Sequence, residues 1–172
     1  MSLPSTLLLI LNIFSTLFMT GLIWFVQVVH YPLFSEVGKE GFIAYQEKHQ
    51  WRTTWVVGPP MLIEAFTSVL LVRYPPIPNT SLLLMGVGLV FLIWASTAFL
   101  QIPCHGELTR GYQEKYQRRL VLTNWIRTIA WTLRTLLLGW IAYSALTAAG
   151  ADENLVRTAP PIDWLTLTFR AA

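Results

Sequence analysis

The stretch LLLILNIFSTLFMTGLIWFVQVV, from Leu7 to Val29, is apolar along nearly its whole length and contains no charged residue. A helix needs about 20 such residues to cross the hydrocarbon of a bilayer. The stretch is unlike a cleaved signal peptide, because no basic region precedes it, its apolar core exceeds about 7–15 residues, and no small-x-small site ends it. We therefore expect a transmembrane helix here.

Three further apolar stretches are long enough to cross a bilayer, and they lie at residues 53–72, 81–102 and 121–146. Hydrophobic residues make up 54% of the chain and charged residues only 12%, with a mean hydropathy of +0.51. A soluble domain has about 25% charged residues. The sequence therefore predicts an all-α integral membrane four-helix bundle over residues 1–149. Residues 150–172 contain no span and are expected to form a surface tail.

The charge balance and the single cysteine narrow the classes of function. A net charge of +3, with no run of basic residues, does not suit a nucleic-acid partner. Cys104 is the one cysteine, so the chain has no internal disulfide. We expect membrane lipid as the surrounding partner, and either a homo-oligomer or a larger membrane complex as the assembly.

Basic residues between the spans predict the orientation in the membrane. The segments 31–52 and 103–120 are long and charged, and we expect each to form an amphipathic helix on the membrane surface. Together they contain seven basic residues: Lys39, Lys48, Arg52, Arg110, Lys115, Arg118 and Arg119. The positive-inside rule places both segments in the cytoplasm. Both termini then lie on the non-cytoplasmic side, and we expect a bacterial inner membrane.

A polar hexapeptide occurs twice, as YQEKHQ from Tyr45 and as YQEKYQ from Tyr112. Two spans separate the copies, so both lie on the same membrane face. This pattern favours two parallel helix–surface helix–helix halves related by an axis along the membrane normal. The alternative is convergent use of amphipathic residues. His49 of the first copy corresponds to Tyr116 of the second, which suggests one ligand and one phenol in a duplicated scaffold.

The chain has three histidines, and all three fall at the cytoplasmic ends of predicted spans: His30, His49 and His105. Imidazole nitrogens suit iron, copper, zinc or nickel, so three at one depth predict a transition metal site. Two of them could instead bind haem b axially. A single interfacial histidine more often hydrogen-bonds only to a headgroup or to the backbone.

Glu64 is the one acidic residue inside a predicted span, and a carboxylate in hydrocarbon needs a partner. Along an unbroken helix it lies near the depth of Arg134, which favours a structural ion pair. If the helix restarts at Pro59 and Pro60 instead, Glu64 rises towards the histidines. It would then be a fourth metal ligand or a catalytic base. The sequence leaves open both the ion pair with Arg134 and this position near the histidines.

The fourth span places Asn124, Arg127, Trp131 and Arg134 on one helical face, which must point inward because arginine cannot face lipid. Asn124 and Arg127 are expected catalytic residues, and Arg127 would bind a substrate anion, a haem propionate or a headgroup phosphate. Arg134, Gln101 and Tyr116 are expected to contact the cofactor. These groups predict a polar pocket beside the histidines. The alternative is a hydrogen-bonded network that sets helix register without any ligand.

Over residues 17–145 the chain resembles the anthrone-oxygenase-like family of small membrane proteins. The shared features are four spans, Gly21, Pro32, prolines at the start of the second span, the segment IPCHGEL at residues 102–108, and Trp125 with Arg127. His105 departs from the family pattern, which has asparagine there. The resemblance implies oxidation of a hydrophobic, aromatic substrate at the membrane face.

These observations together predict a membrane-embedded, metal-dependent oxidoreductase acting on a lipid-soluble substrate at the cytoplasmic face. Two other functions remain open. One is a haem b cytochrome of the membrane. The other is a non-enzymatic subunit or scaffold of a larger complex, for which Trp164 and Phe169 of the tail would provide docking side chains.

Overall fold

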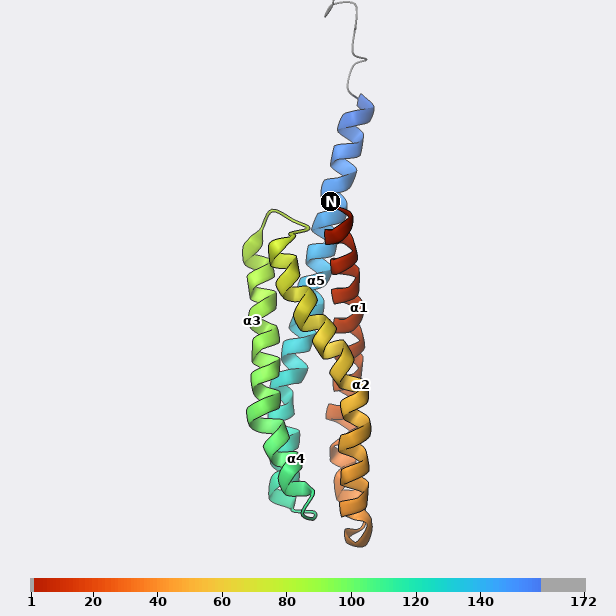
Figure 1. Ribbon diagram of the computed structural model, residues 1–172, viewed down its shortest axis with the longest axis vertical. Coiled ribbons are helices and arrows are strands. Elements are labelled where there is room, and N and C mark those ends of the chain that lie inside the picture. Colours follow the sequence, from red (N-terminus) through yellow and green to blue (C-terminus); the bar gives the residue numbers. More distant parts are fainter. Residues whose placement is uncertain (1, 159–172) are drawn as a thin grey trace, which may run out of the picture.

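The computed structural model describes residues 2–158, and it describes side-chain surroundings for residues 2–150. Every regular element in this range is helical. Four long helical segments run side by side, alternately up and down (Figure 1), and all four are long and apolar enough to span a membrane. Their main helices are α1 (Leu3–Phe25), α2 (Lys39–Arg73), α3 (Thr80–Ser96) and α5 (Glu114–Thr158). The predicted all-α, four-helix architecture is confirmed.

Two π-helical turns interrupt the helices at the same end of the bundle. The first, η1 (Val26–His30), follows α1 and leads into the 3-10 helix η2 (Pro32–Glu36). The second, η3 (Thr97–Gln101), joins α3 to the short α4 (Ile102–Leu108). A π turn inserts an additional residue into the helix and so rotates all the side chains that follow. His30 and Gln101 are each the last residue of such a turn.

The expected surface helix at residues 31–52 is not a separate element. Residues 39–52 form the first turns of α2, which continues without interruption to Arg73. No helix-breaking residue lies between His49 and Thr53, so nothing ends the helix at the membrane boundary. Similarly, residues 114–120 are the start of α5. The prediction of two independent surface helices is therefore wrong, and both segments extend spanning helices.

The helix also does not restart at the two prolines. Pro59 and Pro60 lie inside α2, and each lacks the N–H that would bond the carbonyl four residues earlier. The carbonyls of Trp55 and Val56 therefore have no partner from the helix itself. In Figure 1 the yellow half of α2 leans towards α3, whereas its amber half runs beside α1.

The second hexapeptide begins before its helix. Tyr112 and Gln113 precede α5, and Gly111 makes the turn with a φ of 135°, which L-residues with a side chain rarely adopt. At the other end α5 continues to Thr158, so the expected boundary at residue 150 does not coincide with a helix end. Trp164 and Phe169 lie outside the described residues.

The interior consists of two apolar clusters, one in each half of the bundle. Phe34, Phe42, Leu108 and Leu120 belong to the cluster near the π turns, and each has less than 1% of its surface exposed. Leu83, Leu138 and Ile141 belong to the cluster at the opposite end.

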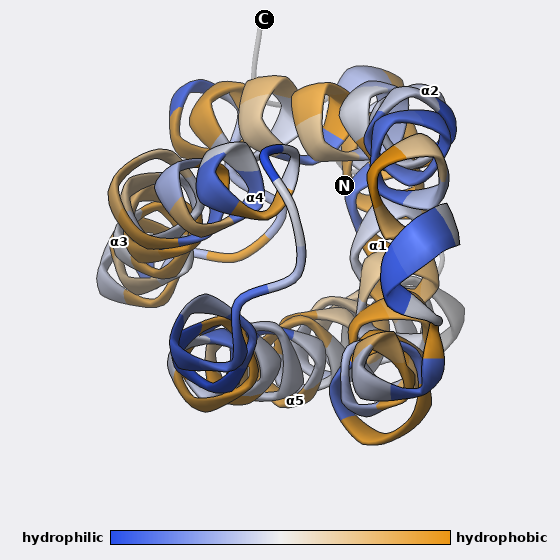
Figure 2. Ribbon diagram, turned by 90° about the horizontal axis from the view of Figure 1, so that it is seen from below, coloured by the Kyte–Doolittle hydropathy of each residue, from blue (hydrophilic) through white to orange (hydrophobic). Residues whose placement is uncertain are grey.

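The outer surface is apolar as well, with several large side chains more than two-thirds exposed: Phe14, Phe66, Phe91 and Leu136. Figure 2 shows apolar residues on outward-facing parts of all the long helices. Such a surface is stable in lipid and not in water.

Candidate functional site

The three histidines meet at one place between the helices. Nε2 of His30, at the end of η1, lies 3.0 Å from Nδ1 of His49 on α2. The ring centroid of His49 is 5.5 Å from that of His105 on α4. These side chains come from three elements that are far apart in the sequence. The bundle therefore brings all three imidazoles into one cluster.

His105 is the most constrained member of this cluster. Its Nε2 lies 3.0 Å from the phenol oxygen of Tyr31, and its Nδ1 lies 2.8 Å from Nε2 of Gln46. Gln50 donates a hydrogen bond of 2.9 Å to the main-chain carbonyl of His105. Gln46, His49 and Gln50 share one face of α2, because they lie three and four residues apart. The first hexapeptide therefore makes two hydrogen bonds to α4 through its glutamines, and it also supplies His49.

One atom beside His105 has no hydrogen-bond partner. Gln46 is fully buried, and its Oε1 makes no hydrogen bond to any described residue. Oxygen and nitrogen of a glutamine amide exchange places when the amide turns over. In the turned form Oε1 would accept the proton of Nδ1 of His105. The Nε2 lone pair of His105 would then accept from Tyr31, or bind a ligand in place of Tyr31.

A cavity of about 390 Å³ lies beside the cluster. Its volume is within the range of small-molecule sites, roughly 300–1,000 Å³. All three histidines line it, together with residues of α1, α2, η3 and α5. Three of its lining side chains, Phe25, Val56 and Ile102, are exposed on the outer surface and apolar. Arg52 and Thr54 are the other exposed lining residues, so the cavity opens sideways through a mouth that is apolar apart from these two side chains.

Arg127 and Gln101 also line this cavity, as the sequence suggested. Nε of Arg127 donates to Oδ1 of Asn124 over 3.1 Å, and its Nη1 donates to Thr97 over 3.4 Å. Asn124 is fully buried behind Arg127 and donates to Oε1 of Gln27 over 2.9 Å. Asn124 thus positions Arg127 and does not itself line the cavity.

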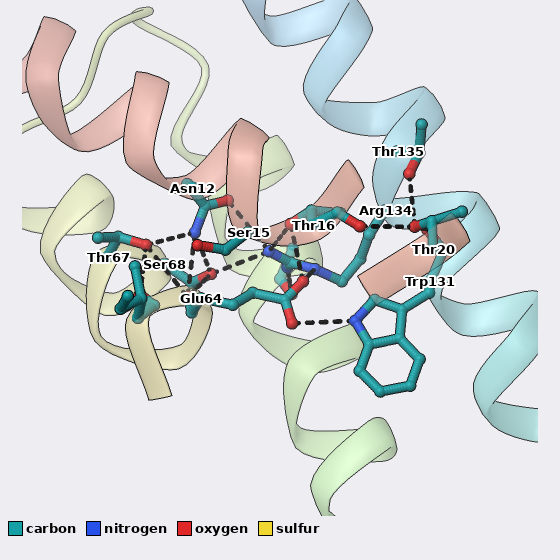
Figure 3. A network of polar contacts seen from close by, with 12 residues as sticks. Asn12, Ser15, Thr16, Thr20, Glu64, Thr67, Ser68, Trp131, Arg134 and Thr135 are labelled. Carbon is teal, nitrogen blue, oxygen red and sulfur yellow. Dashed lines mark hydrogen bonds and ion pairs between the residues drawn. The ribbon is translucent and has the colours of Figure 1, made fainter. Parts of the chain in front are cut away.

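Glu64 lies elsewhere, in a polar layer across the middle of the bundle (Figure 3). Its Oε1 accepts from Nε of Arg134 at 2.8 Å and from Thr16 at 2.7 Å, and its Oε2 accepts from Trp131 at 2.9 Å. Both members of the ion pair are 1% exposed. The sequence predicted either an ion pair with Arg134 or a position near the histidines for Glu64, and the structure agrees with the ion pair.

Glu64 is not close enough to the histidines to join them. It follows His49 by 15 residues on the continuous helix α2, which is about 22 Å along the axis at 1.5 Å per residue. It does not line the cavity. Arg134 also lies in the middle layer, where it donates to Asn12, Ser68 and the carbonyl of Gly86. Neither side chain can therefore contact a ligand beside the histidines.

Tyr116 is partly buried against the core but does not line the cavity, and Lys115 Nζ lies 5.7 Å from its ring centroid. The phenol beside the histidines belongs to Tyr31, which sequence reasoning missed. Gln46 and Gln50 were also missed. The sequence could have indicated these two glutamines, because both belong to the repeated hexapeptide and lie on the same helical face as His49.

As the side chains stand, no group of three or more His, Cys, Asp or Glu residues between positions 2 and 158 has the arrangement of a metal site. Comparison of the chain with family models, with curated proteins and with solved structures gave no match. The class defined here is thus a four-helix, all-α protein with helices suited to a membrane and a histidine-lined cavity. The resemblance to the anthrone-oxygenase-like family stays a prediction.

Proposed function

We propose that His30, His49 and His105 bind one transition metal ion, and that the protein oxidises a lipid-soluble substrate in the adjoining cavity. The observation that supports this proposal is the convergence of His30, His49 and His105 beside one cavity that opens on the outer surface of the bundle. Neutral imidazole is the commonest protein ligand of such metals. Dioxygen would be the oxidant, as in an oxygenase.

The distances are close to those of a ligand set. Two nitrogens that each lie about 2.0–2.1 Å from one ion are separated by roughly 3–3.4 Å. The observed separation of His30 Nε2 and His49 Nδ1 is 3.0 Å. His105 would join them by exchanging the contact of its Nε2 with Tyr31 for the metal. The turned amide of Gln46 would then accept from its Nδ1, which is the second partner that metal-bound histidines need.

The remaining polar groups would have separate roles. Arg127 would orient the substrate, Gln101 would assist it, and Asn124 would hold Arg127 in place. Glu64 and Arg134, expected above as ligand and cofactor contact, are better explained as a structural pair. The substrate would reach the metal through the mouth of the cavity. Iron or copper could supply the oxidation, whereas zinc could occupy the site but has no redox chemistry.

Metal analysis tests the proposal. Detergent-purified protein should contain about one equivalent of iron, copper or zinc, and His105→Ala should lose most of it. Glu47→Gln is a matched control, because Glu47 is exposed on the same helix as His49 and should retain the metal. Wild-type protein that folds normally, and stays metal-free after growth with each metal, would contradict the proposal.

A haem b cytochrome remains the second candidate, but one pair of axial ligands is poorly placed. His30 and His49 are in hydrogen-bond contact, which leaves no room for a porphyrin between them. An absorption spectrum with a Soret band would favour haem through another pair. The scaffold alternative predicts stoichiometric partner chains that persist when all three histidines are replaced.

We also infer that the two halves arose by duplication of a helix pair. Each half has a π turn followed by a proline, Pro32 or Pro103. The last glutamine of each hexapeptide donates to a main-chain carbonyl of the other half: Gln50 to His105, and Gln117 to Tyr31 over 3.2 Å. The basic residues near this end favour a cytoplasmic position for it, with both termini outside, in a bacterial inner membrane.

A further inference from the structure

Tyr31 connects the histidine cluster to Arg127. Its phenol oxygen lies 3.0 Å from Nε2 of His105 and also accepts a hydrogen bond from Arg127. Arginine has N–H donors and no acceptor, so the proton of the phenol points to Nε2 of His105. Nδ1 of His105 then carries the imidazole proton, which the turned amide of Gln46 accepts. The lone pair of Nε2 is therefore directed at the phenol of Tyr31.

The phenol oxygen and the histidine nitrogens have the spacing of a ligand set. Two ligand atoms of one ion lie roughly 3–3.4 Å apart. The cluster contains two such pairs, each separated by 3.0 Å: Nε2 of His30 with Nδ1 of His49, and Nε2 of His105 with the phenol oxygen of Tyr31. The ring centroid of Tyr31 lies 6.1 Å from that of His30 and 5.5 Å from that of His105. All four side chains line the cavity, so the three imidazoles and the phenol border one space.

A metal ion bound by imidazoles alone would keep its whole charge in this space. Histidine binds metals as a neutral ligand, and no aspartate or glutamate of the described residues lines the cavity. Arg127 adds a positive charge next to Tyr31, whereas the carboxylate of Glu64 is engaged by Arg134. Charges held away from water need a counter-charge. A phenolate of Tyr31 would supply one within the cavity itself.

An anionic oxygen ligand also favours one metal over the others. Non-haem iron sites combine histidines with an anionic oxygen, that of a carboxylate. Tyrosine binds the haem iron of catalase. A donor set of three imidazoles and one phenolate therefore suits iron.

We propose that Tyr31 is a fourth ligand of the metal, as a tyrosinate bound to iron(III). This inference rests on the proposed function, because the three histidines supply the other ligands. When iron(III) binds, the phenol O–H bond breaks, the proton leaves to water and an O–Fe bond forms, with no change in the oxidation state of the iron. The iron takes the place of the hydrogen bond between Tyr31 and His105. Arg127 continues to donate to the phenolate oxygen, as an outer partner that holds the ligand in position.

Visible absorption and resonance Raman spectra of the full-length protein in detergent test the inference. The purified protein is loaded with iron(II), oxidised in air and separated from unbound iron by gel filtration. A tyrosinate on iron(III) transfers charge to the metal when it absorbs visible light, whereas imidazole ligands give no such band. We expect a coloured protein whose Raman spectrum, excited within this band, shows tyrosine ring vibrations. These vibrations should shift when the cells are grown with ring-deuterated tyrosine.

Variants then identify the tyrosine. Tyr31→Phe removes a single oxygen atom and should abolish the band. Tyr116→Phe is the matched control and should keep the band, because Tyr116 is a partly buried tyrosine that does not line the cavity. Arg127→Met should move the band to longer wavelength, because a phenolate that accepts fewer hydrogen bonds gives up charge more easily. Thermal unfolding and iron content are measured for each variant, and if Tyr31→Phe binds no iron, the Raman spectrum of the wild type decides.

The outcomes distinguish this inference from the proposed function. Wild-type protein that binds iron(III) without a charge-transfer band, or a folded Tyr31→Phe variant that keeps the band, would overturn the inference and leave the three-histidine site in place. Protein that takes up copper or zinc but no iron would also overturn the inference alone. A band lost in Tyr31→Phe and kept in Tyr116→Phe would support it, whether or not the protein oxidises a substrate. Wild-type protein that binds no metal would reject both.

Discussion

Replacing Arg134 by methionine should be among the most destabilising changes in the chain. Arg134 is 1% exposed, and its Nε donates to Glu64 at 2.8 Å. Its two Nη groups donate to Asn12 at 3.1 Å, to Ser68 at 3.0 Å and to the carbonyl of Gly86. Methionine fills a similar volume but satisfies none of these acceptors. Glu64 would remain ionisable and buried, with only Thr16 and Trp131 as donors.

The structure also sets the magnitude. Removing one partner of a buried ion pair costs about 3–5 kcal/mol, because an uncompensated charge remains. Replacing both partners by apolar residues is often neutral or better. The double variant Glu64→Leu/Arg134→Met should therefore recover much of the loss, with a coupling free energy of at least about 2 kcal/mol. Single neutral hydrogen bonds between membrane helices contribute less, on average about 0.6 kcal/mol.

The assay is reversible unfolding in mixed micelles, followed by circular dichroism, for the wild type, the two single variants and the double variant. The free energies of unfolding form a double-mutant cycle. The charge pair does not stabilise the middle layer as described if the free energy of unfolding of Arg134→Met lies within about 1 kcal/mol of the wild-type value. The same conclusion follows if the effects of the two single substitutions are additive. Thr147→Ala, on the exposed part of α5, serves as the control and should change stability little.

Three other predictions concern the histidines and the prolines of α2. Gln46→Leu should lower the metal content, whereas Gln46→Glu should keep it, because a carboxylate can accept from Nδ1 of His105. Elemental analysis of both variants tests this, and equal metal content in the two would mean that Gln46 does not orient His105. The metal content should fall when the pH is lowered from about 7.5 to 5 and return when the pH is raised again, because protons compete with the metal for the imidazole nitrogens. A metal content that does not change with pH would indicate ligands other than histidine. Replacing Pro59 and Pro60 together by alanine should raise the thermal unfolding temperature, since each interior proline costs a helix about 3 kcal/mol or more. An unchanged or lower unfolding temperature would show that the two prolines do not reduce the stability of this helix.

Several features could be predicted from residues that are close in sequence. The four spans followed from apolar runs, and the inward face of the fourth span followed from the spacing of Asn124, Trp131 and Arg134, all of which are buried. One of the two predictions for Glu64, its shared depth with Arg134, followed from counting residues along an unbroken second helix. Each of these inferences depends only on hydropathy or on the rise per residue, which are local properties of the chain.

Other features depended on contacts between helices. The sequence suggested a separate surface helix before the second span, but the chain stays helical because no residue ends the helix near Thr53. The repeated hexapeptide paired Tyr116 with His49, but the phenol that contacts the histidines is that of Tyr31. The second copy of the hexapeptide starts before its helix, so its first residues do not share the face that the first copy has.

Hydropathy alone determined that this chain has four helices suited to a membrane. The order of these four spans along the chain determined which helix ends lie at the same end of the bundle. Only the tertiary structure decided which side chains meet. Each residue turns the helical face by about 100°, so the additional residue in each π turn redirects everything after it. That rotation is set by packing against neighbouring helices, which is why the contacts of His30 with His49, and of Arg127 with Thr97, could not be predicted from the order of residues.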